Sequence, residues 1–173
     1  MLLMGDEIGR SQGGNNNSWC QNNSLGWMYW DENKQDLELL EFLKNLINLR
    51  KQLIKFINPT FTSNKKNIEN FPSYYWHGTK LDKPDWSSWS HTIAFSINTK
   101  KTNPLVWAGL NAYSKNIDFC VPKLKGNWIK VIDTSIKTNF EPYIFKGKSI
   151  NINSRSSVLI ISEEVFGAKN NIS

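Results

Sequence analysis

Two adjacent carboxylates, Asp6 and Glu7, stand where the apolar run Met1–Met4 ends. The run predicts a buried strand followed by a polar loop, and catalytic carboxylates are common where barrel strands end. Neighbouring side chains on an extended segment point to opposite faces, so these two acids are poorly placed to flank one bond as acid and nucleophile. A structural role is favoured for both: accepting backbone N–H groups or pairing with Arg10.

The segment that follows combines glycine, asparagine and tryptophan without a sustained period. In one interpretation, Asn15, Asn16 and Asn17 bind sugar hydroxyls while Trp19 or Trp27 offers an apolar face to a pyranose ring. In the other, the asparagine side chains bond to the backbone of their own loop. On the residues alone, the second interpretation is favoured.

The remaining reactive side chains form no recognisable catalytic or metal-binding pattern. His77 and His91 lie at no ligand spacing from a cysteine or a carboxylate, so packing or surface roles are favoured. Cys20 and Cys120 are far apart in the sequence, and reduced thiols are the expectation. We therefore expect no metal site and no cofactor.

Composition bears on partners and on location. The net charge of +6 arises from 21 basic and 15 acidic residues, but the lysines are dispersed, which argues against a nucleic-acid-binding surface. No apolar run approaches the roughly 20 residues of a membrane-spanning helix, and no secretory signal is visible. We expect a cytoplasmic protein with neither a nucleic-acid nor a membrane partner.

The elements that must position these residues fall into two classes. Leucine and isoleucine recur at steps of three and four from Asp36 to Ile57, which predicts a long helix that ends before Pro59. Short alternating or apolar runs then predict strands at Thr92–Ile97, Ile117–Val121, Trp128–Ile132, Ser149–Ile152 and Val158–Ile161. The pattern predicts a mainly β fold: an antiparallel β-sandwich preceded by a long loop and one long helix.

Several of these segments resemble one family. Met1–Gln12, Gly14–Gln21, Trp27 and Trp30-Asp31 are similar to the last barrel strand and the following loop of isoamylase-type glycogen debranching enzymes, in the alpha-amylase superfamily. Leu39–Arg50 resembles that family's final barrel helix. Five further segments resemble the family's C-terminal β-sandwich: Trp76–Leu81, Pro84–Ser87, Ser90–Phe95, Trp128–Ser135 and Ser154–Val158.

The resemblance implies a division of the chain. Residues 1–57 correspond to the last strand, loop and helix of a TIM-type (β/α)8 barrel, 58–90 to an irregular connection, 91–162 to the sandwich and 163–173 to a frayed tail. It also implies an α-glucan such as glycogen or starch as partner. The candidate substrate-binding residues are Arg10, Gln12, Asn15, Asn16, Asn17 and Trp19.

In the family, the nucleophile, the general acid and a third carboxylate come from earlier barrel strands, which this sequence does not match. Met1 coincides with an internal methionine of the family motif, so we expect a C-terminal fragment of an enzyme that hydrolyses α-1,6 bonds of glycogen or starch. Such a fragment contains no catalytic residue and is inactive alone. Two alternatives stay open: a non-enzymatic glucan-binding or interaction module, with Trp76, Trp86, Trp89, Trp107 or Trp128 as sugar platforms, and one half of a split enzyme whose partner chain carries the barrel.

Overall fold

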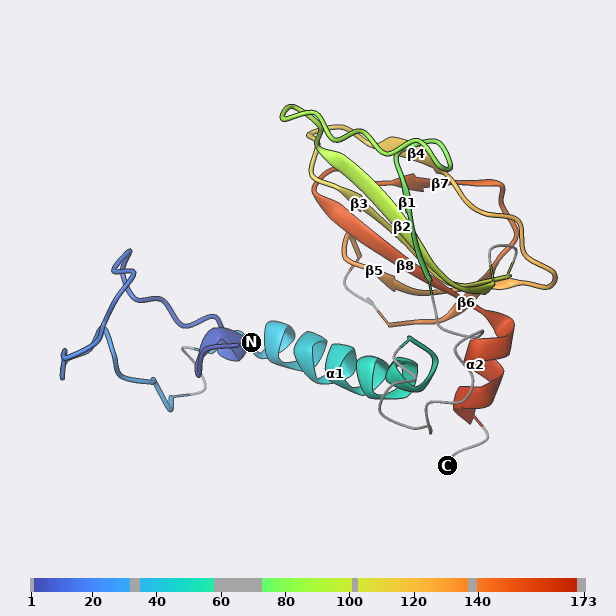
Figure 1. Cartoon of the computed structure of the whole chain (residues 1–173). Coiled ribbons are helices and arrows are strands. Elements are labelled where there is room, and N and C mark those ends of the chain that lie inside the picture. Colours follow the sequence, from blue (N-terminus) through green and yellow to red (C-terminus); the bar gives the residue numbers. More distant parts are fainter. Residues whose placement is uncertain (1, 32–34, 58–72, 101–102, 137–139, 171–173) are drawn as a thin grey trace, which may run out of the picture. The chain divides into compact units, whose positions relative to one another are not determined.

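The computed structural model describes residues 2–31, 35–57, 73–100, 103–136 and 140–170. The chain divides into two compact units, Met1–Arg50 and Lys51–Ser173 (Figure 1). The first consists of a long loop and most of helix α1, and the second contains the β-sheets.

The first unit begins with a turn instead of the predicted buried strand. Leu2, Leu3 and Met4 are 57%, 55% and 64% exposed, and the next residues form the short 3-10 helix η1 (Asp6–Ile8). The prediction fails because Asp6 folds the chain back: its N–H donates to the carbonyl of Leu3, and its carboxylate accepts the N–H of Leu3. The described residues of this unit also include no strand for Leu2–Met4 to pair with.

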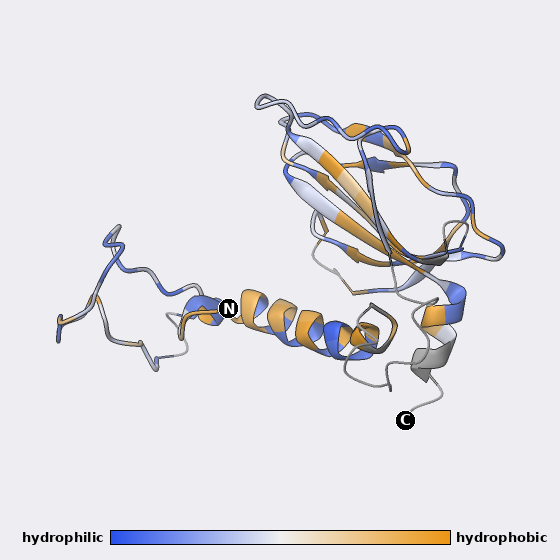
Figure 2. Ribbon diagram, in the orientation of Figure 1, coloured by the Kyte–Doolittle hydropathy of each residue, from blue (hydrophilic) through white to orange (hydrophobic). Residues whose placement is uncertain are grey.

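Helix α1 (Leu37–Ile57) confirms the periodic prediction. Asp36 caps it, since its Oδ1 accepts the N–H of Leu39 at 2.8 Å. Figure 2 shows apolar and polar residues on different sides of the helix. Leu49 and Leu53, one turn apart, are both buried, whereas Leu37 and Ile47 are 51% and 44% exposed.

The second unit is an antiparallel β-sandwich, as the sequence predicted. Its six-stranded sheet has the order β1 (Ser73–His77), β2 (Thr92–Lys100), β3 (Asn103–Asn111), β8 (Ser156–Ser162), β5 (Trp128–Asp133) and β6 (Tyr143–Phe145). A second sheet pairs β4 (Ile117–Cys120) with β7 (Ser149–Ile152), and helix α2 (Glu163–Asn170) follows β8.

Three of these strands and helix α2 were not predicted. β1 lies in the segment expected to be irregular, β6 has only three residues, and β3 is buried on both faces, so it shows no alternation. Helix α2 replaces the expected frayed tail because Ser162 Oγ accepts the N–H of Val165, and Glu163 and Glu164 occupy the first turn. Val165 is only 2% exposed, which fixes the helix.

The core lies between the two sheets. Trp107 and Phe119 meet edge to face with ring centroids 6.3 Å apart. They are surrounded by Val121, just after β4, and by residues of both sheets: Ala94, Trp128, Ile150, Ile152, Val158 and Ile160. Gly109 permits this approach, since a Cβ there would lie 2.5 Å from Cδ1 of Ile152 and 2.6 Å from the ring of Trp107. The sheets pack closely only because this position has no side chain.

Candidate functional site

Arg10 holds the N-terminal loop together. Its Nη1 donates to the carbonyl of Gly26 at 2.9 Å and its Nη2 to Oε1 of Gln12 at 3.2 Å. Its side chain also covers Gly5, where a Cβ would come within 2.8 Å of it. The guanidinium therefore joins two stretches that are 16 residues apart in the sequence.

Gln12 and the asparagines continue this network. Gln12 Oε1 also accepts the Ser18 hydroxyl at 3.2 Å, and its Nε2 donates to the carbonyl of Asn15. Asn15 Oδ1 accepts the N–H of Asn17, and Asn17 Oδ1 accepts the N–H of Trp19. These contacts confirm the interpretation in which the loop bonds to itself.

The predicted sugar-binding residues thus gather in one loop but differ in what they can offer a ligand. Arg10 and Gln12 are engaged in loop contacts. Trp19 is 83% exposed, and among the described residues nothing hydrogen-bonds the side chain of Asn16. The indole of Trp19 and the amide of Asn16 are therefore open to solvent, as are the rings of Trp27 and Trp30 in the same loop.

Asp6 and Glu7 have the structural role that the sequence favoured. Glu7 Oε2 accepts the N–H of Gly5 at 2.8 Å, and Asp6 Oδ2 accepts the N–H of Leu3 at 3.0 Å. Each carboxylate supports its own turn instead of facing a shared bond.

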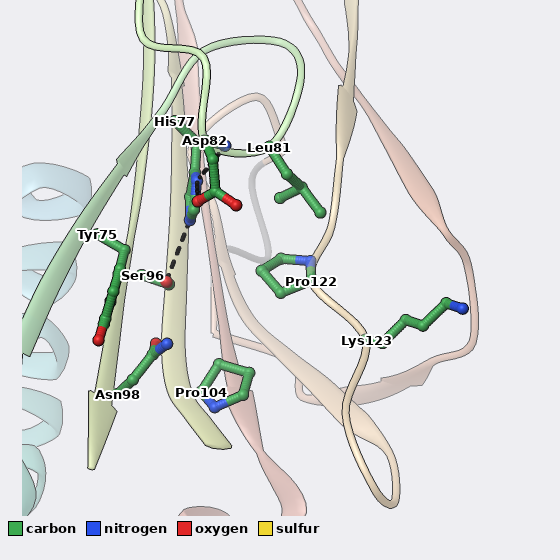
Figure 3. A pocket seen from close by; sticks show the side chains of 9 residues that line it. All are labelled: Tyr75, His77, Leu81, Asp82, Ser96, Asn98, Pro104, Pro122 and Lys123. Carbon is green, nitrogen blue, oxygen red and sulfur yellow. Dashed lines mark hydrogen bonds and ion pairs between the residues drawn. The ribbon is translucent and has the colours of Figure 1, made fainter. Parts of the chain in front are cut away.

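A second polar cluster, not predicted from the sequence, lies in the sandwich. His77, Ser96 and Asp82 line a pocket of about 210 Å³ together with Tyr75, Leu81, Asn98, Pro104, Pro122 and Lys123 (Figure 3). His77 and Ser96 are 3% and 1% exposed, which agrees with the packing role expected for His77. The alternation of Ala94, Ser96 and Asn98 in β2 is the sequence signal that a polar row faces inward.

His77 contacts Asp82 through Nδ1 and Ser96 through Nε2. In the neutral tautomer with its proton on Nε2, Nδ1 accepts the N–H of Asp82 at 2.9 Å, and Asp82 Oδ1 lies 3.3 Å from the same nitrogen. Nε2 then donates to Ser96 Oγ, which lies 3.1 Å away. A histidine that donates to a serine does not act as the base that activates it.

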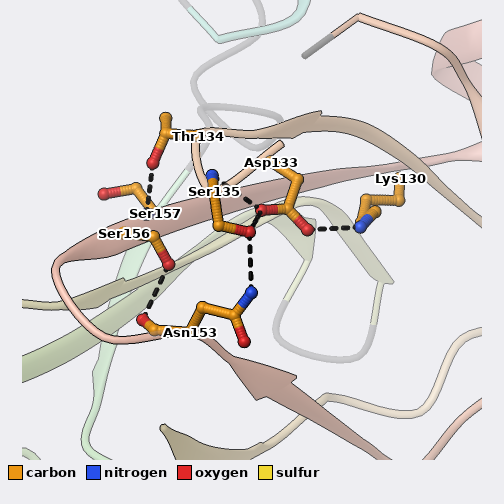
Figure 4. Close-up of polar contacts among 7 residues, drawn as sticks. All are labelled: Lys130, Asp133, Thr134, Ser135, Asn153, Ser156 and Ser157. Carbon is orange, nitrogen blue, oxygen red and sulfur yellow. Dashed lines mark hydrogen bonds and ion pairs between the residues drawn. The ribbon is translucent and has the colours of Figure 1, made fainter. Parts of the chain in front are cut away.

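Another polar network, of which Lys130 is the buried member, joins β5 to the turn before β8 (Figure 4). Lys130, 8% exposed, pairs with Asp133, and Asp133 Oδ1 accepts the hydroxyl of Ser135. Asn153 donates to Ser135 Oγ at 3.0 Å. Burial opposes the charge on Lys130, but Asp133 and Tyr143 together outweigh it, so the pKa of Lys130 is raised. Burial also opposes the charge on Asp133, but Lys130 and Ser135 outweigh it, so the pKa of Asp133 is lowered. This network is structural.

The tryptophans of the sandwich separate into core and surface. Trp107 and Trp128 are 0% and 4% exposed, so neither is a sugar platform. Trp76, Trp86 and Trp89 are 46%, 64% and 76% exposed. Only these three remain candidates for a platform on the sandwich.

Within the described ranges, no three histidine, cysteine or acidic side chains gather as a metal site would require. Both cysteines are unpaired there, as expected. In the same part of the chain, no helix combines the length and apolar character needed to cross a bilayer.

A comparison with known protein families shows to which family the chain is related. Residues 75–162 match the family described as "Isoamylase 1-3, C-terminal". The chain belongs to this isoamylase C-terminal family. The matched range begins in β1 and ends with β8, so it covers the sandwich that holds the His77 and Lys130 clusters.

Relatives of this isoamylase-family chain are much longer proteins. Isoamylase 1, chloroplastic, of Oryza sativa subsp. japonica is 30% identical over 138 residues, which are 78% of this chain and 16% of the relative. The glycogen debranching enzyme of Pectobacterium atrosepticum is 34% identical over 131 residues, 74% of this chain and 18% of the relative. The chain therefore spans less than a fifth of their length.

Solved structures agree on the fold. A pullulanase type I from Bacillus subtilis, complexed with maltose, superposes with a TM-score of 0.59 at 19% identity, over 91% of this chain and 20% of the pullulanase. A pullulanase from Bacillus acidopullulyticus gives the same TM-score at 17% identity, over 91% of this chain and 18% of that protein. At these identities the likeness concerns the fold alone.

Proposed function

We propose that this chain acts as the C-terminal part of an isoamylase-type glycoside hydrolase that cleaves α-1,6 branch bonds in glycogen or starch-like glucans. The observation that carries the proposal is the family match over residues 75–162. It is supported by relatives named isoamylase and glycogen debranching enzyme. In this role, the first unit lines the glucan cleft through Trp19 and Asn16.

On its own the chain is inactive in this proposal. A retaining glycosidase needs two carboxyl groups about 5 to 5.5 Å apart across the scissile bond. Asp6 and Glu7 each accept a backbone N–H, which supports a structural role. In this proposal, the catalytic carboxylates belong to a segment outside these 173 residues, either on a longer polypeptide or on a partner chain.

A chimera tests the proposal. In the Pectobacterium atrosepticum enzyme, the C-terminal segment that this chain matches is replaced by the chain, and reducing ends released from glycogen are measured. We expect debranching by the chimera, none by the chain alone, and none by the relative truncated before the replaced segment. Release of reducing ends by the chain alone, or a folded but inactive chimera, would contradict the proposal.

A Trp19→Ala chimera addresses the cleft wall, with Trp30→Ala as the control because Trp30 is similarly exposed, at 77% against 83%. We expect the first change to raise KM for glycogen by roughly tenfold, the equivalent of 1.4 kcal/mol, and the second to leave KM unchanged. An unchanged KM in the Trp19→Ala chimera would remove Trp19 from the proposed cleft.

A further inference from the structure

One end of the sandwich carries a groove that none of the roles described above uses. It lies where β2 and β3 meet the loop before β2, has a volume of about 420 Å³ and is lined by Trp86, Asp85, His91, Ile93, Leu110 and Ala112, among others. Ile93 and Leu110 are directly opposite each other in the β2–β3 ladder. They lie on the sheet face that also carries Trp76 and Phe95, away from the core.

Trp86 is an exposed aromatic wall held in a fixed position. Its ring meets the edge of Trp76 with centroids 5.5 Å apart, and Trp76 packs on Phe95 at 5.7 Å. Trp86 nevertheless remains 64% exposed. Exposed indoles anchored in this way present an apolar face whose ordering on binding loses little entropy.

Polar groups flank this wall. Asp85 is oriented by the N–H of Ser87, which donates to its Oδ1 at 3.0 Å. The His91 ring stacks on Tyr113 with centroids 5.9 Å apart and planes inclined by 21°. The N–H of Ala112 donates to the carbonyl of His91 at 2.8 Å, which joins the two sides of the groove.

We infer that this groove is a second α-glucan-binding site, in which a glucose ring of a linear α-1,4-linked chain lies against Trp86 while its hydroxyls bond to Asp85 and His91. A pyranose has an apolar ring face and polar hydroxyl groups at its edge. The groove offers a matching combination, in which the apolar indole of Trp86 lies beside the polar side chains of Asp85 and His91. The volume falls within the range of about 300 to 1,000 Å³ typical of small-ligand pockets. The choice of an α-glucan over other sugars rests on the proposed function.

Calorimetric titration of the full chain with maltoheptaose tests the inference. We expect measurable binding that Trp86→Ala weakens by roughly tenfold or more. Trp89→Ala is the matched control, because Trp89 is a more exposed tryptophan three residues away that does not line the groove. Its affinity should equal that of the wild type.

Two further variants test whether a loss of affinity reports on the groove itself. Ala112→Gln extends a side chain into the groove from an exposed position that is not part of the Trp86–Trp76–Phe95 ring contacts, and we expect a similar loss of affinity. Trp19→Ala separates the groove from the N-terminal loop, because binding that persists in this variant and is lost in Trp86→Ala belongs to the groove. Circular dichroism checks that every variant is folded.

Absence of binding, or binding lost in Trp19→Ala but kept in Trp86→Ala and Ala112→Gln, would overturn the inference. The chimera distinguishes this failure from failure of the proposed function. If the chimera is active but the chain does not bind maltoheptaose, the proposed function is retained and only the glucan-binding role of the groove is rejected.

Discussion

The backbone N–H of Asp82 donates to Nδ1 of the buried His77 ring, 2.9 Å away, and the carboxylate Oδ1 of Asp82 lies 3.3 Å from the same nitrogen. The loop between them is shaped for this contact. Asp82 has a φ of 55°, and a Cβ on Gly78 would lie 2.3 Å from the carbonyl oxygen of Lys83. A compact loop of this shape delivers one N–H to the ring while Ser96 receives the ring's own proton.

This contact predicts a dependence of stability on pH. Burial lowers the pKa of His77, and the Asp82 carboxylate only partly offsets this. The unfolded chain takes up the proton near pH 6.5 and the folded chain at lower pH. The stabilisation is thus complete above about pH 6.5 and is lost as pH falls through the folded pKa. Urea unfolding from pH 7.5 to 5 should show a decline that His77→Asn reduces; equal slopes in the wild type and this variant would contradict the prediction.

The Lys130–Asp133 pair predicts a large mutational effect. Asp133→Ala leaves the Lys130 ammonium buried without its carboxylate, so we expect the free energy of unfolding to fall by about 3 kcal/mol. Glu41→Ala breaks the Lys44–Glu41 pair, whose side chains are 59% and 64% exposed, and should cost less than about 0.5 kcal/mol. Chemical unfolding of both variants measures the difference, and comparable losses would contradict the assigned role of Asp133.

Gly109 and Gly167 predict effects of opposite sign for the same change. Gly109→Ala pushes a methyl group against Ile152 and Trp107, and we expect it to destabilise the protein by about 1 to 3 kcal/mol. Gly167 lies within α2, and a Cβ at this position would meet no atom within 4 Å, so Gly167→Ala should stabilise by up to about 1 kcal/mol. Thermal unfolding distinguishes the two; a neutral Gly109→Ala would show that the sheets have room to separate.

The contacts of Arg10 predict that its substitution loosens the N-terminal loop and not the whole fold. Arg10→Lys cannot reproduce the forked contacts to Gly26 and Gln12, so we expect the loop to be cleaved by chymotrypsin about tenfold faster, as loss of a charged hydrogen bond implies. Arg50→Lys, an exposed position in α1, is the control. Mass spectrometry of early fragments should locate the cuts between residues 11 and 27. Unchanged cleavage of the Arg10 variant would mean that the asparagine turns hold the loop without it.

The sequence predicted those features that are periodic or local. The leucine repeat located α1 to within one residue, and alternation located β7 at Ser149–Ile152. Asn15 and Asn17 bond to nearby N–H groups, so their loop-forming role was readable from residue type. β3 was missed because six consecutive residues, Pro104–Gly109, are buried and leave no period to detect.

Features that depend on distant segments were not predictable in this way. Arg10 reaches Gly26, and His77 reaches Ser96 on another strand; neither spacing carries a local signal. The exposure of the tryptophans was ambiguous for the same reason. Trp128 stands in a predicted strand and is buried, whereas Trp86 follows Pro84-Asp85 in a loop and is exposed, so the element type was the one available clue.

The position of β8 in its sheet has a consequence for how the sandwich is made. β8 is the last strand in sequence, yet it lies between β3 and β5. During synthesis, the β1–β2–β3 and β5–β6 halves emerge first, each with an unpaired edge that can join another nascent chain. The sheet closes only when residues 156–162 leave the ribosome, so this domain folds after most of its length has been translated and depends on chaperones most during that interval.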